Sequence, residues 1–192
     1  VLQFYPSSSI SVTTDVYEDL STSDFWIGET YSGLYHYLKN KTIERLVPNA
    51  NHYNSAYAFA EKNNTLWVAG GMINGYEYAH NVNGFYVFSD EQWATHDKYF
   101  NTALDSVYDL IAIAISPDNN QVYFASFGWG LIQYTPLTDK VTVYKSHNTA
   151  LGSANGDAGS IRVADVTFDN DGNLWMTNYL STKPIVVKKA DG

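Results

Sequence analysis

Short apolar stretches alternate with polar turns along this chain, and within the stretches the hydrophobic positions follow the two-residue period of β-strands. Residues 16–37 show the pattern most fully. An apolar strand is followed by a polar turn, a second strand centred on Trp26 and a third strand that opens on Gly33. The 3.6-residue rhythm of an amphipathic helix is not found. The pattern therefore predicts an all-β chain.

The same order of elements occurs four times, which predicts a repeat protein. Each copy has an apolar strand, a polar turn, a strand with a large aromatic residue and a further strand that usually opens on glycine. The aromatic positions recur at intervals of about 40 to 56 residues, close to the period of β-propeller blades. Insertions at 72–83 and 148–160 account for the longer intervals. The equivalent aromatic residues are Trp26, Trp67, Tyr123 and Trp175.

The predicted fold class is an all-β β-propeller of about four four-stranded blades, and we expect an arc of a larger ring. Residues 2–7 match 141–146, the outer strand of the third unit, and residues 1–5 are assigned to the outer strand of a preceding or closing blade. The alternative is a closed four-bladed propeller in which residues 1–5 complete the last blade, since closure removes open sheet edges. Solution scattering separates a closed disc from an open arc. The expected blades are residues 12–47, 56–97, 107–145 and 161–192 of a single propeller domain or segment.

Composition narrows the classes of partner. The formal net charge of −9 argues against nucleic acid, which requires a basic surface, and against an anionic membrane surface. The chain has no cysteine, which excludes disulfides and thiol catalysis. Neither a transmembrane run nor a signal peptide is found in these 192 residues. We expect either a cytosolic chain or a piece of a longer or processed protein.

The repeat units resemble the propeller repeats in extracytoplasmic sensor regions of two-component regulators. Val16-Tyr-Glu-Asp19, Phe25-Trp-Ile-Gly28 and Gly33-Leu-Tyr35 carry this resemblance. The fourth unit, with 168–179 and 184–192, is similar to PorZ-type propeller proteins of the type IX secretion system. Pro184, where other units have glycine, and Tyr123, where they have tryptophan, depart from the repeat.

The resemblance to PorZ-type proteins implies a role. That family is described as two propellers plus a small C-terminal domain at the cell surface, which engages the sortase machinery and binds lipopolysaccharide. The resemblance therefore implies a non-catalytic recognition propeller in the bacterial cell envelope, in the periplasm or at the outer-membrane surface. It implies no cofactor, and it implies further blades or domains in the full-length chain.

Several motifs have ordinary structural explanations. Asp169-Asn-Asp-Gly-Asn173 resembles the start of a calcium loop, but the equivalent turns are not carboxylate-rich and no glutamate follows at the required distance. We interpret it as a plain turn. The strand tryptophans recur at one position in each unit, which predicts packing between blades rather than a binding platform. His36, in a strand among tyrosines, is interpreted as structural.

Candidate binding residues lie in the loops. If strands alternate in direction, the segment that enters each first strand and the loop between the second and third strands share one face of the propeller. Loops on a rigid scaffold are common binding sites, and Tyr, Trp, Asn and Asp suit polar recognition of a glycan or an extended peptide. The same loops also contain Asn74, Glu77 and His147. The ligand-binding candidates are His52, Tyr53, Tyr76, Tyr78, His80, Trp129, Asn155 and Asp157.

These loops have two other interpretations. Long loops can be tolerated decoration with no ligand. A metal held by His52, His80 and His147 would need ligands from three separate loops with no local spacing to support it, so no metal is predicted.

The predicted function is recognition of a glycan or a partner protein in secretion or surface attachment, with Tyr76, Tyr78 and Trp129 as apolar anchors. No Ser-His-Asp or paired-carboxylate arrangement is found, so no catalytic residue is predicted. One alternative is the periplasmic sensor region of a hybrid two-component histidine kinase that recognises oligosaccharides. Another is a metal-dependent propeller lyase or lactonase. A metal-dependent enzyme of this kind would need acidic metal ligands, and the notable acids of the innermost strands are Asp15, Asp109 and Asp165.

Overall fold

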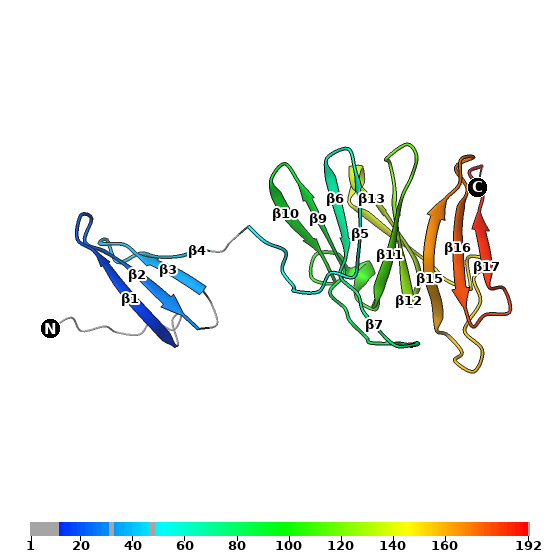
Figure 1. The fold of residues 1–192 in the computed structure, drawn as a ribbon, viewed down its shortest axis with the longest axis horizontal. Helices are drawn as coiled ribbons and strands as arrows, with labels where there is room; N and C mark the ends of the chain where they lie inside the picture. Colours follow the sequence, from blue (N-terminus) through cyan, green and yellow to red (C-terminus); the bar gives the residue numbers. More distant parts are fainter. Residues whose placement is uncertain (1–11, 31–32, 47–48, 192) are drawn as a thin grey trace. The chain divides into compact units, whose positions relative to one another are not determined.

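The structure, a computed structural model, describes residues 12–30, 33–46 and 49–191 (Figure 1). The described residues form antiparallel strands and two single-turn 3-10 helices, η1 (Thr102–Leu104) and η2 (Pro136–Thr138), so the all-β prediction is confirmed. The chain divides into two compact units, Val1–Asn49 and Ala50–Gly192, and each is described by itself. The outer strand predicted at residues 1–5 lies outside the described residues.

The first unit contains one four-stranded antiparallel sheet, here called sheet I, with the strands in chain order. Ile27 and Tyr35 are buried on one side of the sheet. On the other side the Trp26 ring stacks on His36, with ring centroids 4.1 Å apart. His36 thus packs against a residue of its own sheet. Sheet I consists of β1 (Thr13–Asp19), β2 (Asp24–Glu29), β3 (Gly33–Tyr37) and β4 (Ile43–Leu46).

Sheet II begins the second unit and has the strand order β10-β9-β6-β5. Between its second and third strands the chain inserts a small hairpin, β7 (Ile73–Asn74) and β8 (Glu77–Tyr78). The insertion lies between strands that are hydrogen-bonded neighbours, so the sheet itself is uninterrupted. Sheet II consists of β5 (Ala58–Lys62), β6 (Thr65–Ala69), β9 (Phe85–Ser89) and β10 (Gln92–His96).

Seven strands follow in one connected sheet, whose four-stranded and three-stranded parts are called sheets III and IV. They are joined where the end of β12 pairs with the start of β15, at Phe127 opposite Arg162 and Gly128 opposite Ile161. Sheet III consists of β11 (Leu110–Ile115), β12 (Val122–Gly128), β13 (Gly130–Thr135) and β14 (Lys140–Tyr144), and sheet IV of β15 (Ile161–Phe168), β16 (Leu174–Tyr179) and β17 (Ile185–Lys188).

The aromatic residues of the sequence repeat occupy equivalent registers. Each lies in the second strand of its sheet, where it is paired with one residue of the first strand and one of the third. This common register shows that the four units are structural repeats. The pairings are Tyr17–Trp26–His36, Ala60–Trp67–Val87, Ala114–Tyr123–Gln133 and Thr167–Trp175–Val187.

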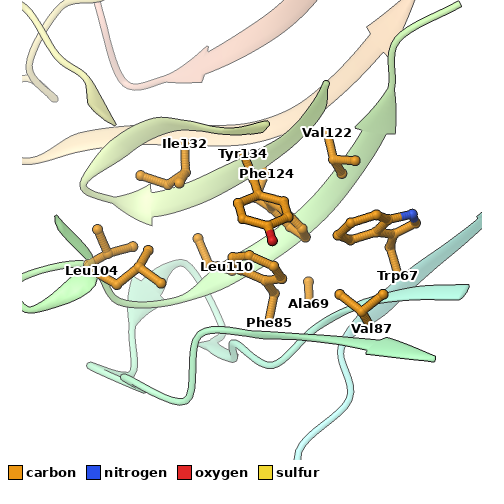
Figure 2. Close-up of a cluster of buried hydrophobic side chains, with 11 residues drawn as sticks. Trp67, Ala69, Phe85, Val87, Leu104, Leu110, Val122, Phe124, Ile132 and Tyr134 are labelled. Atoms are coloured by element: carbon orange, nitrogen blue, oxygen red, sulfur yellow. The ribbon is translucent and has the colours of Figure 1, made fainter. Parts of the chain in front are cut away.

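Sheets II and III pack face to face through an aromatic core (Figure 2). Trp67 from sheet II lies 5.7 Å from the Tyr134 ring of sheet III, and Phe85 stacks on Phe124 at 4.4 Å between centroids. All four side chains are buried. Flat rings fill the space between two sheets, as predicted for blades that pack on one another.

A second core joins sheets III and IV. Tyr123 is buried there and meets Phe168 edge-on, with centroids 5.7 Å apart, while Leu131 and Met176 fill the same cluster. Trp175 differs, because it is 39% exposed on the face of sheet IV that is turned away from this cluster. The repeated aromatic residue is therefore buried in sheets II and III, where the next sheet of the second unit covers it, and partly exposed in sheet IV.

Candidate functional site

The loops at one end of sheets II to IV lie against one another. In each sheet the segment that enters the first strand bonds to a residue at or just beyond the end of the second strand. Ser55 donates to the Gly70 carbonyl at 2.7 Å, and Ser126 donates to the Tyr108 carbonyl at 2.6 Å. In sheet IV the Asn178 amide donates to the Gly152 carbonyl at 2.8 Å. We call the surface formed by segments 50–57, 70–84, 107–109, 126–130, 147–160 and 179–184 the loop face.

The stem of the β7–β8 insertion is fixed by a buried carboxylate from sheet III. Asp109 precedes β11, is fully buried, and accepts the backbone N–H groups of Ala79, His80 and Asn81 at 2.7–2.9 Å. Burial raises the pKa of the Asp109 carboxyl, and these three donors offset part of the rise. Buried charges are tolerated where hydrogen bonds compensate them. The insertion supplies that compensation through its backbone.

The tip of the insertion is fixed by a buried cation from sheet IV. Arg162, in β15, is 4% exposed. Its guanidinium donates to the Tyr76 carbonyl at 2.9 Å, to Glu77 Oε2 at 2.9 Å and to Asp157 Oδ2 at 3.0 Å. Burial alone would lower the pKa of Arg162, but the two carboxylates outweigh burial and raise it. Arg162 therefore joins a loop of sheet II to a loop of sheet IV.

Tyr76 is the most exposed of the predicted aromatic anchors. Its side chain is 76% exposed, and its ring is nearly parallel to that of Tyr179 at the end of β16, with centroids 6.3 Å apart. The Glu77 side chain beside it is 70% exposed although one oxygen bonds Arg162. This corner of the loop face presents an aromatic ring and a carboxylate to solvent.

A row of rings continues from the insertion to sheet III. Tyr78 and His80 both contact the Tyr108 ring, with centroids 5.7 and 5.0 Å away, and Tyr108 lies 5.8 Å from Trp129. The Lys145 ammonium sits 3.2 Å above the Trp129 ring centroid. Burial lowers the pKa of Lys145. One face of Trp129 is therefore covered by a side chain of the protein itself.

His52 and Tyr53 form a separate cluster near the end of β10. The Tyr53 hydroxyl donates to Asp97 Oδ2 at 2.9 Å, and burial together with this bond raises the pKa of Tyr53 to about 12. His52 packs edge-on against Tyr53, and its backbone N–H donates to Thr95. These contacts anchor the segment that enters sheet II.

Asn155 and Asp157 lie in one short turn of the loop that enters sheet IV. The Asn155 side chain is exposed, and its backbone N–H donates to the Leu180 carbonyl at 2.8 Å. Arg162 contacts both Asp157 of this turn and Tyr76 of the insertion, so the structure brings these candidates together. Tyr78, His80 and Trp129 belong to the neighbouring row of rings.

Arg162, Tyr108 and Tyr179 belong to this site but are not among the residues that the sequence pattern predicts. Arg162 had a visible signal, because it is a charged residue between Ile161 and Val163 in a strand expected to be buried. Tyr108 and Tyr179 had no such sequence signal, because each lies near a strand end and tyrosine is common throughout the chain. Asp109, considered from the sequence as an acid of the innermost strands, bonds backbone N–H groups of the insertion.

None of the eight candidates lines the apolar cavity of about 410 Å³ between sheets III and IV, whose walls include Leu131, Tyr144 and Met176. Within residues 12–30, 33–46 and 49–191 there is no group of three or more His, Asp or Glu side chains placed to hold a metal ion. The same described ranges contain no helix with the length and hydropathy needed to span a bilayer.

No protein-family model and no curated protein matches this sequence. Solved structures do. PorZ, a bacterial surface component of the type IX secretion system of Porphyromonas gingivalis, is 23% identical with a TM-score of 0.64, over 95% of this chain and 25% of that chain. The extracellular domain of a putative hybrid two-component system from B. thetaiotaomicron is 17% identical with a TM-score of 0.53, over 98% of this chain and 24% of that chain.

These likenesses confirm the predicted β-propeller fold. The chain spans about a quarter of the length of both solved structures. The number of blades in the ring, and whether the ring closes, stay predictions.

Proposed function

We propose that this chain is a non-catalytic recognition segment of a bacterial cell-envelope protein, which binds a glycan or a partner protein through the loop face. The observation that carries the proposal is the insertion of sheet II. The buried charges of Asp109 and Arg162 fix its stem and its tip, while the Tyr76 side chain at the tip stays exposed. A fixed loop that presents an exposed aromatic ring binds with little loss of conformational entropy.

The chemistry around Tyr76 suits a ligand that has both an apolar face and hydroxyl or amide groups. The Tyr76 ring offers contact area, and the Glu77 side chain next to it and the Asn155 side chain of the same loop face offer exposed hydrogen-bonding groups. Of the three anchors inferred from sequence, Tyr78 packs beside Arg162 and Trp129 lies under Lys145. Tyr76 is therefore the anchor to test first.

The cell-envelope location and a role in secretion or surface attachment rest on resemblance. PorZ is described as a bacterial surface component of a secretion system, and the second solved structure as an extracellular domain. That second description supports the alternative proposal, the sensor region of a hybrid two-component histidine kinase. The coding sequence downstream of Gly192 discriminates between them, because a transmembrane helix followed by a kinase would replace the first proposal with the second.

The binding experiment compares two tyrosines of equal exposure. Glycan arrays and envelope extracts are probed with the wild-type chain, with Tyr76→Ala and with Tyr99→Ala, since Tyr99 is 77% exposed in a different turn. Tyr76→Ala should abolish binding at an unchanged melting temperature, whereas Tyr99→Ala should bind like wild type. Full binding by Tyr76→Ala, or equal losses in both variants, would remove the loop face from consideration.

A further inference from the structure

The insertion of sheet II makes its outermost contacts with sheet IV. Its tip, residues 75–77, is linked to β15 by Arg162 and lies beside the end of β16 at Tyr179. In Figure 1 the segment that carries β7 runs along the lower end of β11 toward β15. The insertion therefore passes across the segment that leads into β11 of sheet III, where Asp109 accepts hydrogen bonds from the stem of the insertion.

Arg162 has few alternative partners. The side chain is 4% exposed, and within the described residues its hydrogen-bond acceptors are the Tyr76 carbonyl, Glu77, Asp157 and, weakly at 3.5 Å, Ser160. Two of these four belong to the insertion. If the tip moved away, the guanidinium would keep Asp157 and Ser160 as hydrogen-bond acceptors and the Phe127 ring, whose centroid is 5.6 Å away. Leaving a buried charge with too few partners is costly, so Arg162 favours the docked position of the tip.

The contacts of Arg162 also determine the direction of Tyr76. The guanidinium holds the backbone carbonyl of Tyr76 rather than its ring, and it holds the next side chain, Glu77. These bonds fix the backbone at the root of the ring. The Tyr179 ring then limits where the Tyr76 ring can lie.

We propose that Arg162 is the positioning residue of the recognition surface: from sheet IV it fixes the tip of the sheet II insertion, so that presentation of Tyr76 requires sheet IV to be folded. The recognition surface is thus composite. Arg162 itself is buried and contacts no ligand. The inference rests on the proposed function only in taking Tyr76 as the ligand contact, and the positioning can be measured without any ligand.

Hydrogen–deuterium exchange of the full chain tests this. Arg162→Met keeps an unbranched side chain that ends about where the guanidinium of arginine begins, and it removes the charge and the donors. Amides of residues 73–78 should then exchange at least about a hundredfold faster, because the tip loses a buried charged contact, while amides of β12 and β13 keep their protection. Arg162→Lys, which keeps a cation but lacks the planar fork of the guanidinium, should give an intermediate rate. Unchanged exchange at 73–78 would overturn the proposal, and so would a uniform loss of protection across the whole unit.

Two further variants keep the test valid if Arg162→Met does not fold. Glu77→Ala removes an exposed side chain and one acceptor, so it should speed exchange at 73–78 by about tenfold with the core intact. Tyr76→Ala removes the ring but leaves the carbonyl that Arg162 holds, so exchange should change by less than about threefold. If Tyr76→Ala released the tip more than Glu77→Ala did, ring stacking rather than the arginine would position it.

The two proposals fail separately. If Tyr76→Ala retains binding but Arg162→Met frees the tip, the recognition proposal is wrong and the positioning proposal stands. If Tyr76→Ala abolishes binding but Arg162→Met leaves exchange at 73–78 unchanged, the positioning proposal is wrong and the recognition proposal stands.

Discussion

Trp67 and Trp175 occupy the same register in their sheets but have different surroundings. Trp67 is buried between sheets II and III against Tyr134, whereas Trp175 is partly exposed and donates its indole N–H to Asp169 at 2.7 Å. A residue's register is set by its strand, but its burial depends on which sheet lies opposite. The same residue type therefore contributes differently to stability in the two sheets.

Replacement of these tryptophans should separate the two environments. Trp67→Ala should lower the free energy of unfolding by about 3–5 kcal/mol, because a large cavity remains in a packed core. Trp175→Ala should cost about 1–2 kcal/mol, since it removes one charge-assisted hydrogen bond and partly exposed area. Denaturant unfolding of both variants measures the difference, and equal losses would argue against packing of sheet II on sheet III through Trp67.

Asp169 is the turn residue that receives the Trp175 bond, and it also accepts backbone and side-chain N–H groups of Asn173. These donors, the Trp175 indole first, lower the pKa of Asp169 to about 2 from its usual 3.8. A carboxyl with a lowered folded-state pKa stabilises the fold at pH values above its usual pKa, and that contribution is lost as the pH falls toward 2.

The Trp175 indole N–H resonance reports this titration. In NMR spectra its chemical shift should stay constant down to about pH 4 and then move as Asp169 is protonated, with a midpoint near 2. In Asp169→Asn the same resonance should show no such step. A midpoint at or above the usual carboxyl pKa would mean that the indole does not hold the carboxylate.

The glycine at the start of the third strand is required by the connection between the second and third strands. Gly33, Gly84 and Gly130 all have positive φ, at 87°, 67° and 97°. At Gly84 an added Cβ would also lie 2.0 Å from the His96 carbonyl of β10, and at Gly130 it would lie 2.2 Å from the Tyr144 carbonyl of β14. The repeated glycine of the sequence thus reflects a left-handed turn that in sheets II and III also lies close to the backbone of the outer strand.

Gly75 and Gly84, at the tip and the end of the insertion, provide a matched comparison. Gly75 has a φ of 62°, similar to Gly84, but open space surrounds its Cβ position. Gly75→Ala should therefore cost about 1–2 kcal/mol, the strain of a left-handed residue alone. Gly84→Ala should cost about 2–5 kcal/mol, because β10 must also shift. Thermal or denaturant unfolding checks the order, and a larger effect at Gly75 would contradict the placement of Gly84 against β10.

At the scale of the second unit, sheet III connects the two cores. One of its faces packs on sheet II through Phe124 and Tyr134, and the other packs on sheet IV through Tyr123 and Leu131. Its backbone also pairs with β15. Because sheets II and IV both bury an apolar face against sheet III, sheets II to IV should unfold as one cooperative unit.

Phe85→Ala in sheet II and Met176→Ala in sheet IV test this cooperativity. Each should lower the free energy of unfolding by about 2–5 kcal/mol. Hydrogen exchange of peptides from β6 and β16, measured with increasing denaturant, should show both regions losing protection in the same step in either variant. Loss of protection in β16 alone for Met176→Ala would show that sheet IV unfolds independently.

The sequence by itself determined the strands, the turns and the repeat. Alternation of apolar and polar residues, glycine at left-handed turns and an aromatic residue in each second strand are local signals, and pairing between adjacent strands depends on little else. Trp26, Trp67, Tyr123 and Trp175 can therefore be aligned from the amino-acid sequence alone, and their common register agrees with that alignment. The likeness to PorZ-type propellers was visible for the same reason.

Only the tertiary structure decided which loop residues come together. Arg162 bonds Glu77 across 85 residues of sequence, and Asp109 bonds the backbone of Ala79 across 30. No local pattern encodes such pairs, because they arise where loops of different sheets converge after the sheets have packed. For the same reason the sequence could nominate both Tyr76 and Trp129 as anchors, whereas the fold leaves the first exposed and places Lys145 over the second.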